Sequence, residues 1–303
     1  MRNFRDRSSD RFEHFGRAIA RFPNESRKGG AAMNIGLVTR RQKRIISVFL
    51  YAFALMWLFP FYTAIRNSLK VNGIRNYVDL FTSDLNGISL LGTFRNSTLI
   101  AIGSTIILLA VGSLAAFAFS KLRFFAKETL YVSVLLCLAV PGVVIMIPFY
   151  YILKNLDLYN TLWSVIFSEA VLTLPFAVLM LRNYYDNLPP ELMESASIDG
   201  ASKLQMFNRI YLPLSTPALI NLGVLSVMWS FQDFLLPLMF LTDKSVLTAT
   251  VAVNTLKGLF GFSPADLGKF NAALVVLGMP AVVIFLFARK YITNGITSGA
   301  VKE

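Results

Sequence analysis

The sequence predicts an all-α membrane protein with six transmembrane helices. Of its 303 residues, 55% are hydrophobic and only 15% are charged, whereas soluble globular proteins contain about 25% charged residues. Six apolar runs are each long enough to cross a bilayer core, which takes about 20 helical residues. The basic residues are distributed unevenly among the segments between these runs, as in proteins with a defined inside and outside. We therefore expect a polytopic membrane protein.

The first 44 residues form a basic segment with no apolar run, so they do not resemble a cleavable signal peptide. They hold 12 Lys and Arg against 4 Asp and Glu, which is most of the net charge of +12. We expect residues 1–44 to lie in the cytoplasm without a fixed fold, and Met33 is a second candidate start. No basic face interleaved with aromatic residues recurs later, so no nucleic-acid partner is expected.

The six apolar runs define a transmembrane domain over residues 45–290, followed by a cytoplasmic tail at 291–303. A Thr216-Pro217 pair is typical of a helix start and places the beginning of the fifth span. Prolines inside the spans predict kinks, which bundles tolerate. The predicted spans cover residues 45–65, 96–120, 129–153, 158–181, 216–242 (interrupted by Asp233) and 270–288.

The distribution of Lys and Arg predicts the orientation. With the N-terminus inside, the cytoplasmic segments hold 21 of these residues and the external segments hold 8. Cytoplasmic loops carry the excess of Lys and Arg. We therefore expect both termini in the cytoplasm, together with the segment between the fourth and fifth spans.

That segment, residues 191–213, is a polar interval that predicts two short helices around a turn. Pro189 and Pro190 suit the start of the first helix. Asp199-Gly200 commonly turns the chain. In the second helix, Leu204, Phe207 and Tyr211 form an apolar stripe at positions i, i+3 and i+7, and Pro213 is expected to end it.

The same interval resembles the EAA loop, the signature of the membrane-spanning permease subunits of ABC importers. The resemblance implies a six-span type I importer permease fold in which a cytoplasmic helix-turn-helix, residues 186–214, couples the spans to an ATPase. An ordinary hairpin loop, with Glu194 only stabilising a helix start, is the alternative. The residues that carry the coupling role are Glu194, Ser195 (where the family usually has Ala), Ala196, Asp199, Gly200, Ala201 and Phe207.

Other stretches are similar to the carbohydrate-importer branch of that family, and within it to the maltose-type second permease subunit. They are Pro148-Phe149-Tyr150, Leu174-Pro175-Phe176 and the tail from Gly295 to Lys302. At Phe231-Gln232-Asp233-Phe234 the branch commonly has Trp-Asn followed by an acid and Phe. The resemblance implies transport of a sugar or oligosaccharide.

The resemblance also implies partners in the inner membrane of a bacterium: a second homologous permease, two copies of an ABC ATPase, an extracytoplasmic solute-binding protein, and lipid. The chain has no G-x-x-x-x-G-K-[ST] motif. ATP and Mg would therefore bind the ATPase, with no cofactor in this chain. Cys137 and His14 are each the only residue of their type, which excludes an internal disulfide, a histidine-rich metal site and a Ser-His-Asp triad in the membrane body. We expect a transporter subunit rather than an enzyme.

Two acids inside the spans are candidates for a substrate path. Glu169 and Asp233 lie within apolar runs, where a charge costs at least about 2.5 kcal/mol at the bilayer centre. They would accept hydrogen bonds from sugar hydroxyls, with Gln232 and Asn221 as neutral partners. A structural hydrogen bond between helices is the alternative for each acid. The three tryptophans, Trp57, Trp163 and Trp229, are more typical of interface anchors than of sugar stacking.

Three other function classes compete with this interpretation. An ion-coupled secondary transporter would use Glu169 and Asp233 as coupling acids, but the cytoplasmic loop opposes it. An intramembrane aspartyl protease would need these acids to share one site, and the Gly-x-Gly-Asp context of such proteases is absent. A scaffold without transport would leave the coupling loop unexplained.

Overall fold

The computed structural model describes residues 40–82, 85, 87–259, 261 and 263–300. The predicted basic segment therefore lies outside the described residues except for its last five positions. The chain divides into two units, Met1–Phe59 and Pro60–Glu303, and each is considered by itself. Within the described residues the fold is helical, with a single isolated bridge between Leu85 and Ile88 in place of any sheet.

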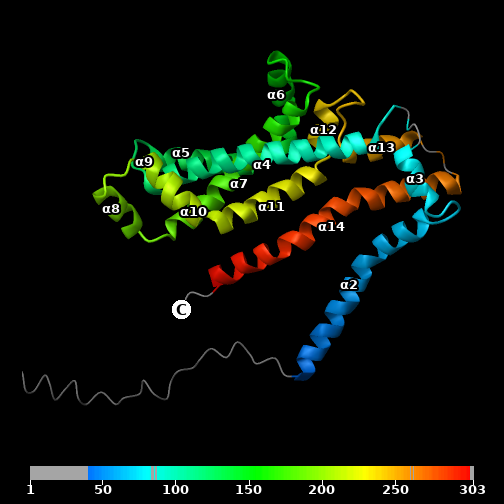
Figure 1. Cartoon of the computed structure of the whole chain (residues 1–303), viewed down its shortest axis with the longest axis horizontal. Coiled ribbons are helices and arrows are strands. Elements are labelled where there is room, and N and C mark those ends of the chain that lie inside the picture. Colours follow the sequence, from blue (N-terminus) through cyan, green and yellow to red (C-terminus); the bar gives the residue numbers. More distant parts are fainter. Residues whose placement is uncertain (1–39, 83–84, 86, 260, 262, 301–303) are drawn as a thin grey trace, which may run out of the picture. The chain divides into compact units, whose positions relative to one another are not determined.

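The helices follow the apolar runs of the sequence and add short elements between them (Figure 1). They are α2 (Arg40–Ser68), α3 (Arg75–Thr82), α4 (Leu90–Lys121), α5 (Lys127–Leu136), η2 (Cys137–Ala139), α6 (Gly142–Asn155), α7 (Leu162–Asp186), α8 (Glu191–Ile198), α9 (Lys203–Met206), the π-helical turn η3 (Phe207–Tyr211), α10 (Leu212–Leu214), α11 (Thr216–Gln232), α12 (Leu235–Phe240), α13 (Ala249–Leu259) and α14 (Pro264–Ala300).

Four described helices are long and apolar enough to cross a membrane unbroken, namely those at Arg41–Ser68, Leu90–Lys121, Leu162–Asp186 and Pro264–Arg289. Two further pairs of helices meet the same criteria only when each bent pair is taken together. Six spans result when each pair counts as one. The expected all-α membrane fold is therefore confirmed, with two of the predicted spans broken rather than continuous.

The third span is broken at Pro141. The helices Lys127–Ala139 and Gly142–Asn155 meet at 104°, so the kink expected from a proline within the span at 129–153 is a sharp break between two helices. Val140 is extended (ψ 121°) because the residue before a proline avoids the helical region. In Figure 1, α6 accordingly points away from the line of α5.

The fifth span is bent at its start. Helices Lys203–Leu214 and Thr216–Gln232 meet at 73°, and the break falls at Ser215. Pro213 therefore does not end the helix as predicted: it lies inside α10, after a π-helical turn in which the Leu212 N–H donates to the Phe207 carbonyl. Such single π turns are rare and are often found at functional sites.

The same span is also shorter than predicted. Helix α11 stops at Gln232, and Asp233 is extended with φ −66° and ψ 130°. The Asp233 carboxylate then accepts hydrogen bonds from the backbone N–H groups of Leu235 at 3.0 Å and Leu236 at 3.4 Å. These bonds satisfy donors at the start of α12, so Asp233 breaks the predicted run over 216–242.

The core of the second unit is the packing of α4 against α7 and α11 (Figure 1). Small residues allow close approach: a Cβ added to Gly112 would lie 3.0 Å from the Cβ of Ala177. Such small residues are typical of helix interfaces in membranes. A buried hydrogen bond of 2.8 Å from the Thr105 hydroxyl to the Ser226 hydroxyl joins α4 to α11.

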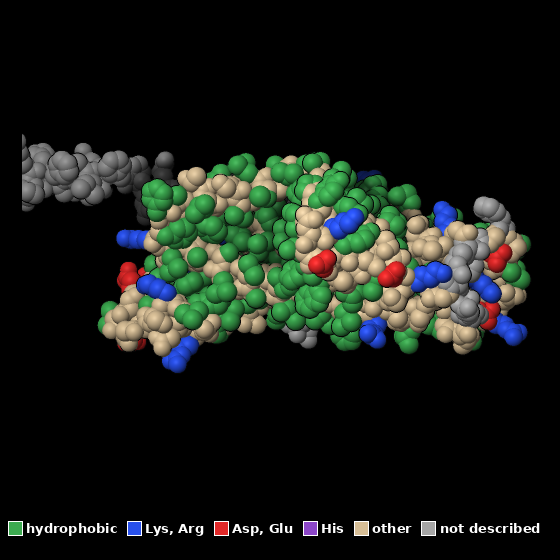
Figure 2. Space-filling model, turned by 90° about the horizontal axis from the view of Figure 1, so that it is seen from above, with side chains coloured by type: hydrophobic (Ala, Val, Ile, Leu, Met, Phe, Trp, Pro, Cys, Tyr) green, Lys and Arg blue, Asp and Glu red, His purple; other side chains and the backbone are tan. Residues whose placement is uncertain are grey.

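The two ends of this bundle carry different elements. Helices α8 and α9 lie at one end, and α3 and α13 lie at the other (Figure 1). Figure 2 shows charged side chains at both ends, with a largely hydrophobic stretch between the left-hand group and the middle of the molecule. Helix α14 begins at Pro264 and continues to Ala300, so the predicted tail is helical through that residue.

Candidate functional site

The loop between α7 and α11 folds as two short helices with a left-handed turn. Gly200 has φ +75°, a conformation that residues with a Cβ adopt only with strain. Its N–H donates to the Ser197 carbonyl at 3.1 Å, and the Ala201 N–H donates to the Ala196 carbonyl at 3.0 Å. This is the hydrogen-bond pattern of a Schellman motif, which fixes the end of α8.

The start of α9 is also held by local hydrogen bonds. The Ser202 hydroxyl accepts from the Gln205 N–H at 3.3 Å, and the Gln205 side chain accepts from the Ser202 N–H at 2.8 Å. This reciprocal pair is a capping box. Helix α8 instead has no side-chain capping hydrogen bond at its own start, although Glu191 and Glu194 lie in its first two turns. The predicted helix-turn-helix is therefore present and held by local hydrogen bonds on both sides of Gly200.

An aromatic cluster joins this loop to the bundle. Phe207 and Tyr211 are buried, and their rings lie 5.4 Å and 5.1 Å from the ring of Phe117 on α4. Tyr185 on α7 lies 5.9 Å from Tyr211. Aromatic pairs at such distances stabilise packing beyond the area they bury. The loop is thus seated on both α4 and α7.

One residue of the predicted seating stripe does not take part. Leu204 is 62% exposed, whereas Phe207 is 5% exposed, so the stripe prediction is wrong for Leu204. Ile198 at the end of α8 is also exposed, at 87%. Ile198 was not selected from the sequence.

The predicted coupling residues divide into two groups. Glu194, Ser195, Asp199 and Gly200 are exposed, while Ala196 and Phe207 are buried and Ala201 is half-buried. Beside the exposed group lies a groove of about 580 Å³ between the end of α4 and helices α8 and α9. Its lining combines basic residues with one acid and includes Lys121, Leu122, Arg123, Pro190, Met193, Glu194 and Lys203.

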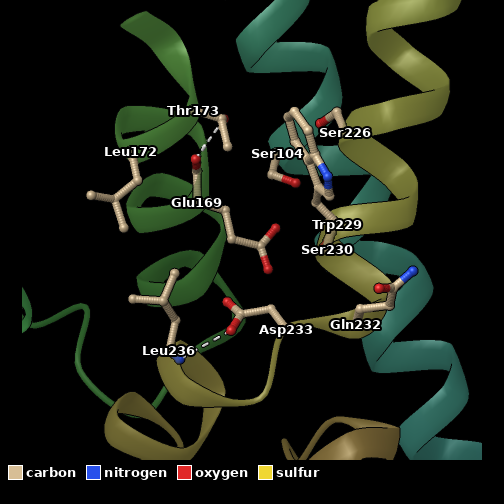
Figure 3. Close-up of a pocket in the computed structure, with 10 residues that line it drawn as sticks. All are labelled: Ser104, Glu169, Leu172, Thr173, Ser226, Trp229, Ser230, Gln232, Asp233 and Leu236. Atoms are coloured by element: carbon tan, nitrogen blue, oxygen red, sulfur yellow. Dashed lines mark hydrogen bonds between the residues drawn. The ribbon is translucent and has the colours of Figure 1, made fainter. Parts of the chain in front are cut away.

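A second candidate site is a cavity of about 280 Å³ where α4, α7, α11 and α12 meet (Figure 3). It contains three of the four residues predicted for a substrate path: Glu169, Gln232 and Asp233. Asn221 is not among the lining residues, and its side-chain oxygen is buried without a hydrogen-bond partner. The lining comprises Ser104, Glu169, Leu172, Thr173, Ser226, Trp229, Ser230, Gln232, Asp233 and Leu236.

Glu169 occupies the inner wall of this cavity. Its residue is 7% exposed, and both carboxylate oxygens are buried without a hydrogen-bond partner. The Ser230 hydroxyl, on the facing helix α11, is also buried and unpartnered. Buried polar atoms without partners are costly, so the cavity is built to receive polar groups.

Trp229 is the one tryptophan among the cavity's lining residues. Its ring meets Phe176 edge-on at 5.3 Å and is 41% exposed. The small hydroxyl residues beside it were not selected from the sequence. Helical spacing could have indicated them, because residues four apart share a helix face. Thr173 follows Glu169 by four positions, and Ser230 follows Ser226 by four. No cluster of three potential metal ligands occurs among the described residues.

The sequence matches the family described as binding-protein-dependent transport system inner membrane component over residues 108–298. The inner membrane ABC transporter permease protein YcjP of Escherichia coli K12 is 31% identical over 267 residues, which is 82% of this chain and 93% of that protein. The trehalose/maltose transport system permease protein MalG of Thermococcus litoralis is 33% identical over 69% of this chain and 74% of its own length.

The fold is shared with a solved structure of a bacterial ABC transporter involved in the import of the acidic polysaccharide alginate. The TM-score is 0.73 at 18% identity, over 84% of this chain and 98% of the matched chain. The matches give no support to a secondary transporter or a protease, and the chain is a component of a transporter rather than an enzyme. The chain belongs to the binding-protein-dependent transport system inner membrane component family, the permease subunits of ABC transporters.

Proposed function

We propose that this chain is the permease subunit of an ATP-driven importer and is coupled to its ATPase through residues 186–214. The observation that carries the proposal is the exposed helix-turn-helix of α8 and α9, fixed around Gly200 and seated on α4 and α7 by Phe207 and Tyr211. A loop that is rigid in itself and packed on two spans transmits displacement to both. The coupling role predicted from the sequence is thus compatible with the geometry.

The proposed substrate is a sugar or oligosaccharide. Relatives named for such substrates include the trehalose/maltose permease of Thermococcus litoralis and the melibiose/raffinose/stachyose import permease protein MelC of Bacillus subtilis, which is 29% identical over 86% of this chain. The cavity beside Glu169 offers hydrogen-bond acceptors and hydroxyl groups on several helices. Such a lining suits a hydroxyl-rich ligand, because precisely placed polar groups in a small pocket provide orientation.

The proposed assembly contains a second homologous permease, two copies of an ABC ATPase with ATP and Mg, and an extracytoplasmic solute-binding protein. A second solved alginate transporter, with a TM-score of 0.65 at 17% identity, is in complex with a periplasmic protein bound to an alginate pentasaccharide. We place the complex in the inner membrane of a bacterium with both termini of this chain in the cytoplasm. The excess of Lys and Arg in the predicted cytoplasmic segments supports that orientation.

In this proposal the loop residues have distinct roles. Glu194 and Ser195 contact the ATPase from the exposed side of α8, joined by the apolar side chains of Ile198 and Leu204, while Asp199 shapes the turn after α8. Gly200 sets the angle between the two helices. Ala196, Ala201 and Phe207 pack the loop against the bundle. Movement of the ATPase then shifts α4 and α7, and both of these helices contribute to the cavity.

The substitution Gly200→Val tests this coupling. A Cβ at Gly200 would meet no atom within 4 Å, so the only cost is the backbone strain of positive φ, roughly 1–3 kcal/mol. We expect the complex to assemble poorly with its ATPase, or hydrolysis to lose its link to uptake, when both are measured after co-purification and reconstitution.

Gly73→Val is the matched control. Gly73 has φ +58°, also with no atom within 4 Å of an added Cβ, and it lies in the turn before α3 rather than in the coupling loop. It carries the same backbone strain and is expected to leave ATPase binding intact. Wild-type binding, hydrolysis and uptake in Gly200→Val would refute the proposed function.

A further inference from the structure

The ionisable side chains that line the cavity at the junction of α4, α7, α11 and α12 are all acidic. Two carboxylates, Glu169 and Asp233, line it, and none of the described lining residues is Lys or Arg. Figure 3 shows the two carboxyl groups on neighbouring parts of the cavity wall. Small cavities with low-dielectric walls concentrate the field of their charges. The wall of the cavity therefore contains no basic residue that could offset the charge of an anionic ligand.

The two acids are not equivalent. Asp233 is partly engaged, because its carboxylate accepts the N–H groups of Leu235 and Leu236 at the start of α12. Glu169 has no such partners, and both of its oxygens are buried. Acids inside membrane spans are costly and usually face a ligand path or a wet cavity. Glu169 thus presents its two carboxylate oxygens to the cavity, while the Asp233 carboxylate is held in place by the start of α12.

The dimensions limit the ligand to a small unit. A volume of about 280 Å³ lies just below the usual range of roughly 300–1,000 Å³ for pockets that hold drug-sized ligands. It suits a single sugar ring rather than a chain of several. Trp229 provides an aromatic wall, and the unpartnered Ser230 hydroxyl provides a further polar contact.

We propose that this cavity is a subsite for one uncharged saccharide unit and that Glu169 is the residue that excludes acidic saccharides. The inference rests on the proposed function and adds a charge preference to it. Hydroxyl groups of a neutral sugar would donate to the Glu169 carboxylate, which is otherwise unpartnered. A carboxylate on the sugar would instead meet Glu169 and Asp233 with no countercharge, since the lining contains no cation.

This preference follows from the side chains and not from the fold. The transporter that shares the fold with a TM-score of 0.73 takes part in the import of an acidic polysaccharide, yet only 18% of the aligned residues are identical. One backbone arrangement therefore accommodates different substrates when the residues lining its path differ. The charge of residues 169 and 233 is a direct way to set that difference.

A thiol-labelling experiment measures the charge of the cavity without requiring transport. Cys137 is the only cysteine and is exposed on η2, so Cys137→Ser gives a background without thiols in this chain. Thr173→Cys then places one thiol in the cavity, four residues after Glu169, where the native hydroxyl bonds only to its own helix. The assembled complex is treated with cationic and anionic methanethiosulfonates, and labelling of this chain is followed by mass.

The ratio of cationic to anionic reaction rates is the quantity of interest. At the cavity thiol we expect this ratio to exceed that at native Cys137 by on the order of tenfold, from one or two nearby carboxylates. Glu169→Gln and Asp233→Asn should each lower the ratio, with the larger change for Glu169→Gln. The ratio at Cys137 serves as the matched control, because no variant of the cavity should alter it.

Saccharide protection tests the ligand class directly. We expect glucose, a neutral monosaccharide of the same ring size as glucuronate, to slow labelling of the cavity thiol, and glucuronate to have no effect until Glu169→Gln is introduced. Equal protection by glucuronate in the unmodified cavity would overturn the inference. A ratio of cationic to anionic labelling rates that is unchanged by Glu169→Gln would also overturn it. None of these readings depends on the ATPase, so a failure here is distinct from a failure of the coupling proposal.

Discussion

The ring of Phe207, in the π-helical turn after α9, lies 5.4 Å from the ring of Phe117, near the C-terminal end of α4. This contact connects a loop that is exposed on one side to a helix that lines the cavity through Ser104. The aromatic cluster therefore holds the loop to the bundle.

Phe207→Ala is expected to weaken the packing of the loop on the bundle. Removal of a buried aromatic side chain costs about 3–5 kcal/mol, and the loss falls on the packing of the loop. We expect lower thermal stability of the purified complex and weaker retention of the ATPase. Leu204→Ala, at an exposed position one turn earlier, should change stability little. Equal effects of the two substitutions on stability would contradict the assignment of Phe207 to the seat.

Asn96→Ala should destabilise the opposite end of the bundle. The buried Asn96 amide donates to the carbonyls of Ser245 at 2.9 Å and Leu247 at 3.0 Å, which ties α4 to the segment before α13. Its loss leaves carbonyls without a donor, at about 1–3 kcal/mol. Thr98→Ala is the control, because that hydroxyl bonds only within α4 to Phe94. Thermal unfolding of the two variants in detergent measures the effect of each substitution. Similar midpoints would show that Asn96 does not stabilise the contact between α4 and the segment before α13.

Gly112→Val should separate α4 from α7. The added Cβ would lie 3.0 Å from the Cβ of Ala177, and a methyl attached directly to the backbone cannot rotate away. Overpacking of this kind costs roughly 1–3 kcal/mol. Ala110→Val, two positions away and exposed, adds apolar volume without meeting α7. Protein yield and thermal midpoint are the measurements, and equal values for both variants would show that this helix contact tolerates expansion.

The proposed orientation predicts the location of three fused reporters. Fusions at Lys154 and Leu259 should report an external location, and a fusion at Ser202 should report an internal one, because the predicted cytoplasmic segments carry the excess of Lys and Arg. Alkaline phosphatase and green fluorescent protein fusions distinguish the two sides. Phosphatase activity at Ser202 would place the loop away from any cytoplasmic ATPase and would contradict the coupling proposal as well.

The number and location of the spans followed from hydropathy because uninterrupted apolar runs near 20 residues have few other uses. The breaks within the third and fifth spans were not predicted. Pro141 was expected to kink a helix, yet proline chemistry alone does not distinguish a kink from a 104° bend. Asp233 was expected inside a continuous run, and only its hydrogen bonds to Leu235 and Leu236 show that it starts a new helix.

The helix-turn-helix was predictable because its signals are local: a proline pair, a turn dipeptide and a stripe of apolar residues. The contacts of this loop with α4 and α7 were only partly predictable. Helical spacing placed Leu204 and Phe207 on one stripe, but spacing does not show how far the bundle extends beside α9, and Leu204 is exposed. The cavity was found only through its acids. Its serines and threonine are common residues, and their convergence depends on how α4, α7 and α11 pack.

The π-helical turn at η3 amounts to one residue more than an α-helix would hold between Phe207 and Leu212, since the N–H of Leu212 reaches five positions back. Deletion of a single exposed residue there, such as Asn208, would restore α-helical winding. It would also rotate α8 and α9 relative to α11 by about 100°, the angle of one α-helical residue. A one-residue insertion or deletion is thus enough to re-aim the whole docking face.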